Sequence, residues 1–171
     1  MKDIWIRIHA WLDENSPEGY GYLRPGASDS AISAADQAMR LELPDDIKAS
    51  YRIHDGQENE PGLIGGEGWC LLPLREMVEQ WGRWSRSDLK NARCVPIAWG
   101  GSGDYVFLNL RPETGESGCL MIQRGDSTDP DPLTPSFTAW LTRFADQLED
   151  GEFAYSEDEE CVMYEDEIDL D

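Results

Sequence analysis

The sequence predicts an α+β fold, in which a mostly antiparallel β-sheet of about four to six strands packs against several helices. Segments with apolar residues at helical spacing stand near both ends of the chain. Between residues 94 and 123, three short runs rich in β-branched and aromatic residues follow one another, separated by glycine-containing turns. We expect a single domain over residues 1–155 and an acidic C-terminal tail over residues 156–171.

Three helices are predicted in the first third of the chain. The first is a short amphipathic helix whose apolar residues recur at helical spacing: Ile4, Trp5, Ile8, Trp11 and Leu12. The second has Ser28 or Asp29 as its N-cap. Its inner face holds Ile32, Ala35 and Met39. The third has Pro44 in its first turn and ends at Gly56 as a left-handed cap. Its inner face holds Ile47, Tyr51 and His54.

A loop, a strand and a fourth helix are predicted next. Residues 57–68 (QENEPGLIGGEG) contain four glycines and one proline, so we expect a mobile loop and the first candidate for a binding surface. The run WCLLPL at 69–74 predicts a short strand. The helix that follows is expected to lie on the sheet, with an apolar face made of Leu74, Met77, Val78, Trp81 and Trp84.

Three strands and a closing helix complete the domain. The runs CVPIAW (94–99), YVFLNL (105–110) and CLMIQ (119–123) predict an antiparallel meander. Residues 135–151 begin with a Pro-Ser cap signal and predict a helix that packs back on the sheet. Its apolar stripe holds Phe137, Trp140, Leu141, Phe144 and Leu148.

The charge of the chain excludes several classes of partner. Lys and Arg number 14 against 35 Asp and Glu, which gives a net charge of -21, and twelve of the acidic residues lie in residues 149–171. Such a chain repels nucleic acids and anionic membrane surfaces, so we expect neither as a direct partner. We expect the tail to be solvated; docking of its interspersed apolar residues is the alternative.

The expected compartment is the cytoplasm. No run approaches the roughly 18 apolar residues that cross a bilayer. Residues 1–13 also lack the basic start, apolar middle and small-residue cleavage site of a signal peptide.

The residues that could take part in catalysis or metal binding do not form a recognisable motif. The cysteines have no CxxC pair and no nearby histidine, so we expect free thiols at Cys70, Cys94, Cys119 and Cys161. His9 and His54 are expected to be structural or exposed. Residues 100–104 (GGSGD) precede a strand, which favours a tight turn in which Asp104 bonds backbone N–H groups over a phosphate-binding loop. The sequence therefore predicts no catalytic residue, no metal site and no cofactor.

Two tryptophans leave two interpretations open. Trp81 and Trp84 are three residues apart on one helix and are flanked by Arg83 and Arg86. They can pack in the core, or they can extend an exposed aromatic surface that anchors a protein partner.

In the order of its motifs, the chain resembles the SUKH superfamily, in particular its Smi/Knr branch. Five phrases carry the resemblance: WIRIHAWL, LRPGASDSAISAADQAMRLELPDDIKASYRIHDGQ, WCLLPLREMVEQW, IAWGGSGDYVFLNL and PSFTAWLTRFADQLEDGEFAY. The second phrase is the most specific. Ser50 departs from the pattern, because an apolar residue is usual there, and the acidic tail lies beyond the family domain.

The resemblance implies an α+β domain that binds proteins and does not catalyse a reaction. Its bacterial members look like immunity proteins, so we expect the neutralisation of a cognate polymorphic or contact-dependent toxin. A basic nuclease domain would suit the charge of -21. The alternative is a regulatory or scaffolding module, as in the fungal cell-wall-assembly regulators; a hydrolase using His54 with Asp55 or Asp104 is a third hypothesis. From position alone, the expected partner-binding residues are Glu58, Glu60, Glu67, Trp81, Trp84, Asp104, Glu157, Asp158, Glu159 and Glu160.

Overall fold

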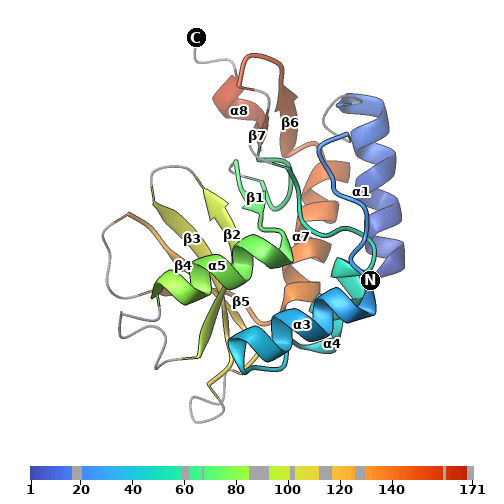
Figure 1. Ribbon diagram of the computed structural model, residues 1–171. Coiled ribbons are helices and arrows are strands. Elements are labelled where there is room, and N and C mark those ends of the chain that lie inside the picture. The colour runs from blue at the N-terminus through green and yellow to red at the C-terminus, as the bar shows by residue number, and fades with distance from the viewer. Residues whose placement is uncertain are drawn as a thin grey trace.

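The computed structural model describes residues 1–16, 21–58, 62–66, 68–84, 93–100, 103–111, 117–125, 130–159 and 161–168 (Figure 1). Its helices are α1 (Lys2–Asn15), α3 (Asp29–Met39), α4 (Asp45–Tyr51), α5 (Leu74–Trp84), α7 (Phe137–Glu149) and α8 (Glu165–Ile168). Its strands are β1 (Cys70–Leu71), β2 (Cys94–Gly100), β3 (Asp104–Asn109), β4 (Leu120–Gln123), β5 (Asp131–Thr134), β6 (Phe153–Ser156) and β7 (Cys161–Tyr164). The predicted α+β class is confirmed.

The main sheet has five strands in the order β1-β2-β3-β4-β5, and each neighbouring pair is antiparallel. The predicted meander is confirmed as β2, β3 and β4, while β1 and β5 add the two edges. Within this meander, Leu108 pairs with Val95 on β2 and with Leu120 on β4. Because side chains alternate along a strand, Leu108 faces one side of the sheet and its neighbour Phe107 faces the other.

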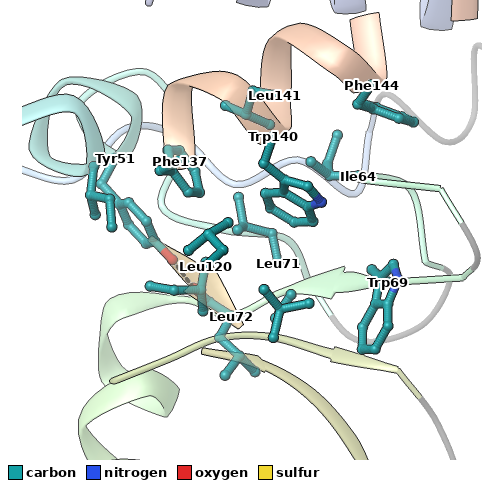
Figure 2. Close-up of a cluster of buried hydrophobic side chains, with 14 of the residues drawn as sticks. Tyr51, Ile64, Trp69, Leu71, Leu72, Leu120, Phe137, Trp140, Leu141 and Phe144 are labelled. Carbon is teal, nitrogen blue, oxygen red and sulfur yellow. Dashed lines mark hydrogen bonds between the residues drawn. The ribbon is translucent and has the colours of Figure 1, made fainter. Parts of the chain in front are cut away.

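The inner face of the sheet and the helices form the main core. Helix α7 packs against β5 on one side and against α1 and α4 on the other (Figure 1). Figure 2 shows Phe137 and Trp140 of α7 turned toward Leu71 and Leu120 of the sheet. The predicted stripe on α7 is confirmed, because all of its residues are buried: Phe137, Trp140, Leu141, Phe144 and Leu148. Burial of each such side chain contributes on the order of 1.5–3 kcal/mol.

Two helices begin where their capping serines predict. The side chain of Ser28 accepts a hydrogen bond from the N–H of Ala31, and that of Ser136 accepts one from the N–H of Ala139. These bonds satisfy N–H groups that lack a partner within the first turn of a helix. The predicted inner face of α3 is confirmed, because its three residues are buried: Ile32, Ala35 and Met39.

Helix α4 is shorter than the sequence predicts. It ends at Tyr51, so His54 does not lie on its face and Gly56 is not its cap. Gly56 does adopt a positive φ of 68°, but a Cβ on it would meet the backbone of Leu71, Leu72 and Pro73. The close approach of the segment leading into β1 therefore requires glycine here, rather than the end of a helix.

The segment expected to be a mobile loop contributes to the core where the structure describes it. Leu63 and Ile64 are fully buried, and Gly65 and Gly66 have positive φ values of 97° and 70°. A Cβ on Gly65 would lie 2.2 Å from Cζ2 of the Trp140 ring. The expectation of a mobile loop is therefore wrong for Leu63 and Ile64, which belong to the core, while the expectation that this segment binds a partner stays a prediction.

The expectation of a solvated tail is wrong for strand β7, whereas Glu157, Asp158 and Glu159 before it are exposed. Strand β7 pairs with β6, and Val162 is fully buried. The N–H of Val162 donates to the carbonyl of Gly62, and its carbonyl accepts from the N–H of Gly68. These bonds hold the C-terminal hairpin, β6 with β7, against residues 62–68 (Figure 1). Apolar residues within the acidic segment thus dock, which was the alternative expectation.

Candidate protein-binding surface

The candidate surface is the outer sheet face, which we define as the side of the main sheet opposite α7. It consists of a second buried cluster and its partly buried neighbours: Trp84, Cys94, Tyr105, Phe107, Cys119 and Met121. Strands β2, β3 and β4 supply most of these residues, and the C-terminal end of α5 supplies Trp84. Trp81, one turn earlier on α5, packs against the main core instead. The two tryptophans that the sequence treats as a pair therefore join different clusters.

Three aromatic rings form the centre of the outer sheet face. The ring centroids of Trp84 and Phe107 lie 4.4 Å apart, and those of Trp84 and Tyr105 lie 4.8 Å apart in an edge-to-face arrangement. Phe107 is buried, whereas Trp84 and Tyr105 are each partly exposed. The two exposed rings are thus held in a fixed position by a buried third ring, which is the arrangement expected of an aromatic anchor for a partner.

Burial favours the neutral form of two ionisable groups of this face, Cys94 and Tyr105. Burial raises the pKa of the Cys94 thiol, although the charge of Arg111 opposes the effect. Burial also raises the pKa of the Tyr105 phenol, against the opposing charge of Arg83. The thiol of Cys119 donates to the sulfur of Met121 at 3.7 Å. The outer sheet face therefore presents aromatic rings, sulfur atoms and a phenol hydroxyl, all of which can contact an apolar surface of a partner.

Asp104 lies beside this face, but its carboxylate has a structural task. It precedes Tyr105 at the start of β3, and one of its oxygens accepts a hydrogen bond from the backbone N–H of Gly125. The predicted bonding of backbone N–H groups by Asp104 is confirmed, although the N–H comes from the connection after β4 instead of from the turn 100–104 itself. Residues 101 and 102 of that turn lie outside the described residues.

The structure places the other described acidic candidates on elements that do not contribute to the outer sheet face. Glu58 forms an ion pair with Arg24 at 3.0 Å. Glu157, Asp158 and Glu159 are exposed in the turn between β6 and β7. Glu60, Glu67 and Glu160 lie outside the described residues. Of the described candidates, the fold gathers Trp84 and Asp104 around Tyr105, while the acidic candidates stand on other elements.

Sequence reasoning missed a contact between the two histidines. The Nε2 atoms of His9 and His54 lie 2.7 Å apart, and Nδ1 of His54 donates to the carbonyl of Arg24 at 2.8 Å. Since Nδ1 carries the hydrogen, Nε2 of His54 accepts and Nε2 of His9 donates. Burial lowers the pKa of both side chains, and the neighbouring His54 lowers that of His9 further. No spacing signal could have found this pair, because 45 residues separate its members.

In the part of the chain that the structure describes, no group of three or more His, Cys, Asp or Glu side chains is arranged to hold a metal ion. Within the same residues, we find no helix with the length and hydropathy that crossing a membrane requires.

The chain is similar to a family of fungal regulators and to parts of longer proteins. It is 34% identical to a glucan synthesis regulatory protein of Neurospora crassa over 83 residues, which cover 47% of the chain and 15% of that protein. It is 30% identical to the cell wall assembly regulator SMI1 of Saccharomyces cerevisiae over 91 residues, which cover 51% of the chain and 18% of that protein. It is 25% identical to the F-box only protein 3 of Homo sapiens over 187 aligned positions, which cover 95% of the chain and 39% of that protein.

The chain spans less than half the length of each of these relatives. The model of the SMI1/KNR4 family (SUKH-1) matches residues 26–143, from the turn before α3 to the middle of α7. This match covers more than half of the chain, including the whole main sheet, and confirms the resemblance seen in the sequence motifs. The chain therefore belongs to the SMI1/KNR4 family (SUKH-1).

Proposed function

We propose that this chain is a regulatory protein-interaction module that acts by binding a partner protein through the outer sheet face. The names of its fungal relatives, regulators of glucan synthesis and of cell wall assembly, support a regulatory role better than toxin neutralisation. The observation that carries the proposal is the pair of partly exposed rings, Trp84 and Tyr105, fixed by the buried ring of Phe107. Fixed aromatic side chains lose little conformational entropy on binding and dominate the energy of many interfaces.

The test compares two truncations of exposed apolar side chains. Tyr105→Ala removes a ring from the outer sheet face, and Ile6→Ala removes the side chain of Ile6, which is 62% exposed on α1. The wild type and both variants are used to capture proteins from the source cell, and each captured protein is then purified and titrated. We expect Tyr105→Ala to weaken binding by roughly tenfold or more and Ile6→Ala to leave it unchanged.

One further measurement and one outcome complete this test. Thermal unfolding of each variant shows whether a loss of binding reflects loss of the fold. An affinity that is equal for the wild type and Tyr105→Ala would place the interface on another surface and would contradict the proposal.

A second candidate function is neutralisation of a basic toxin, as in an immunity protein. The net charge of -21 favours it, because an acidic chain is steered toward a basic groove such as that of a nuclease. The exposed Glu157, Asp158 and Glu159 supply such charge at the tip of the C-terminal hairpin. A single basic partner at about 1:1 that is inactive when bound would favour this function over the regulatory one.

The contribution of the hairpin tip to such binding can be measured separately. Replacing Glu157, Asp158 and Glu159 by Ala should slow association with a basic partner and flatten its dependence on salt. The matched control replaces three exposed acidic residues of α1 by Ala: Asp3, Asp13 and Glu14. Equal association rates and salt slopes for both triple variants would remove the hairpin tip from the mechanism.

A further inference from the structure

A small pocket lies between α7, the Gly65–Gly66 turn and the C-terminal hairpin, on the inner side of the sheet. Its volume is about 30 Å³. That is roughly twice the volume needed to hold one water molecule, so the pocket admits a group the size of a carboxylate but not an aromatic ring. Its walls are mainly aromatic and include Trp69, Trp140, Phe144, Phe153 and Tyr164.

Two buried indoles that line this pocket have no hydrogen-bond acceptor among the described residues. Trp69 and Trp140 are each only 4% exposed. Trp5, by contrast, uses its indole N–H to bond Ser50. Neither indole nitrogen is among the fully buried polar atoms that lack a partner, so solvent reaches both, and each N–H is available to a water molecule or a ligand in the pocket.

The orientation of both rings directs these N–H groups toward the pocket. A Cβ on Gly100 would meet the Cε3–Cζ3 edge of Trp69, so the opposite, nitrogen-bearing edge faces away from β2. A Cβ on Gly65 would meet the Cε2–Cζ2 edge of Trp140, which adjoins its nitrogen, and Gly65 is itself a wall of the pocket. Figure 2 shows the two nitrogen atoms on the sides of the rings that face the space below Phe144.

A positive charge stands at the rim of the same pocket. Arg143, one turn along α7 from Trp140, lines the mouth and is exposed. It forms no ion pair with any described residue, although the chain carries 35 acidic side chains. The amide of Gln147, another lining residue, donates to Glu152, which does not itself line the pocket. A single compact negative charge can therefore enter, whereas a polyanion would be repelled by the net charge of the chain.

We propose that this pocket binds a carboxylate group carried on a short apolar chain. The guanidinium of Arg143 and the indole N–H groups of Trp69 and Trp140 donate to the carboxylate oxygens, and the aromatic rim contacts the apolar chain. The same chemistry is offered by a free aliphatic carboxylic acid and by the C-terminal residue of a polypeptide. This site is separate from the outer sheet face and does not depend on the function proposed for that face.

The test follows the indole N–H signals of the full chain by ¹⁵N–¹H NMR, with Trp69→Phe and Trp140→Phe variants to assign them. The probes are N-acetyl-leucine and its neutral amide, with sodium acetate and sodium chloride as ion controls. We expect only N-acetyl-leucine to move the signals of Trp69 and Trp140, with a dissociation constant on the order of millimolar. Arg143→Gln should weaken this binding roughly tenfold, while the exposed control Arg75→Gln on α5 should not.

A further comparison distinguishes a polypeptide C-terminus from a small free acid as the source of the carboxylate. A tetrapeptide that ends in leucine, compared as free acid and amide, binds better than N-acetyl-leucine if a polypeptide C-terminus is the ligand, and equally if a small acid is. The proposal is overturned if neither acid moves the two signals, if the amides move them equally, or if acetate and chloride reproduce the effect as adventitious ions only. Equal affinities for the wild type and Arg143→Gln would overturn it as well.

Discussion

At the scale of single residues, one buried hydrogen bond explains a departure from the family pattern. Ser50 stands where an apolar residue is usual, and its side chain is fully buried. The indole Nε1 of Trp5, which is 1% exposed, donates to the Ser50 hydroxyl at 2.9 Å. The serine therefore satisfies a buried donor that an apolar side chain would leave without a partner.

Ser50→Ala should consequently lower the free energy of unfolding by about 1–3 kcal/mol, because the Trp5 N–H stays buried without an acceptor. Urea denaturation of the variant measures this loss. In a Trp5→Phe background the same substitution should cost much less, since no donor remains. An equal cost in both backgrounds would show that the hydrogen bond is not the reason for the serine.

The His9–His54 contact predicts how stability depends on pH. Both pKa values are lowered in the folded state from the ordinary value of 6.5, so the unfolded chain binds protons that the folded chain resists. The stabilisation is therefore complete above pH 6.5, and it is lost as the pH falls through the two folded-state pKa values. Double protonation would also bring two N–H groups to a separation of 2.7 Å.

Urea midpoints measured between about pH 7.5 and pH 5.5 should therefore fall as the pH is lowered, in a range where most carboxylates do not titrate. A His9→Gln, His54→Gln double variant should show a shallower fall over the same range. Parallel curves for the wild type and this variant would exclude the histidine pair as the cause.

At the scale of elements, the sequence predicted the helices whose ends and buried faces depend on residues close together in the chain. The N-cap serines and the apolar stripes of α3 and α7 depend on residues three or four positions apart, and both helices form where expected. The segment 62–66 and the strand β7 depend on each other across about 100 residues, through Gly62 and Val162. A glycine-rich segment and an acidic segment each look solvated when taken alone, and only their pairing makes them part of the core.

Glycine substitutions can test this docking at the level of elements. Gly66 has a φ of 70°, and a Cβ on it would lie 2.1 Å from Cζ of Phe153 in β6. Gly66→Ala should therefore lower the free energy of unfolding by about 2–4 kcal/mol. Gly82→Ala, in α5 with nothing within 4 Å of its Cβ, should raise it by about 0.5–1 kcal/mol. Urea denaturation measures both; a neutral Gly66→Ala would show that the hairpin does not dock on the turn.

At the scale of the whole molecule, the fold decides which candidate residues can act together. Trp84 and Asp104 are 20 positions apart in sequence, yet both adjoin Tyr105, because the ring of Trp84 at the end of α5 packs against the rings of β3. Glu58 instead bonds Arg24, and Glu157 stands at the tip of the hairpin. The net charge could predict the sign of the charge on a partner but not the place where the partner binds. Net charge is summed over all residues and does not identify any one surface.

The net charge of the chain also predicts how salt affects its stability. Several cations are already used in ion pairs, such as Arg7 with Asp146 and Glu149 at 2.6 Å. With 35 acidic residues against 14 basic ones, repulsion between acidic side chains remains across the folded surface. Salt weakens both kinds of interaction, but exposed ion pairs contribute only about 0–1 kcal/mol each, whereas the repulsion acts among all the excess charges. Screening should therefore stabilise the fold.

Raising sodium chloride from about 10 mM to about 300 mM at pH 7.5 should increase the unfolding free energy by about 1–2 kcal/mol and Tm by roughly 2–8 °C. Calorimetry at the two salt concentrations measures the change. Repeating it near pH 4.2, the isoelectric point, provides the control, because the excess negative charge is then absent and the increase should vanish. A Tm that falls with salt at pH 7.5 would mean that attractive pairs, such as the bridge from Arg7 to α7, outweigh the repulsion.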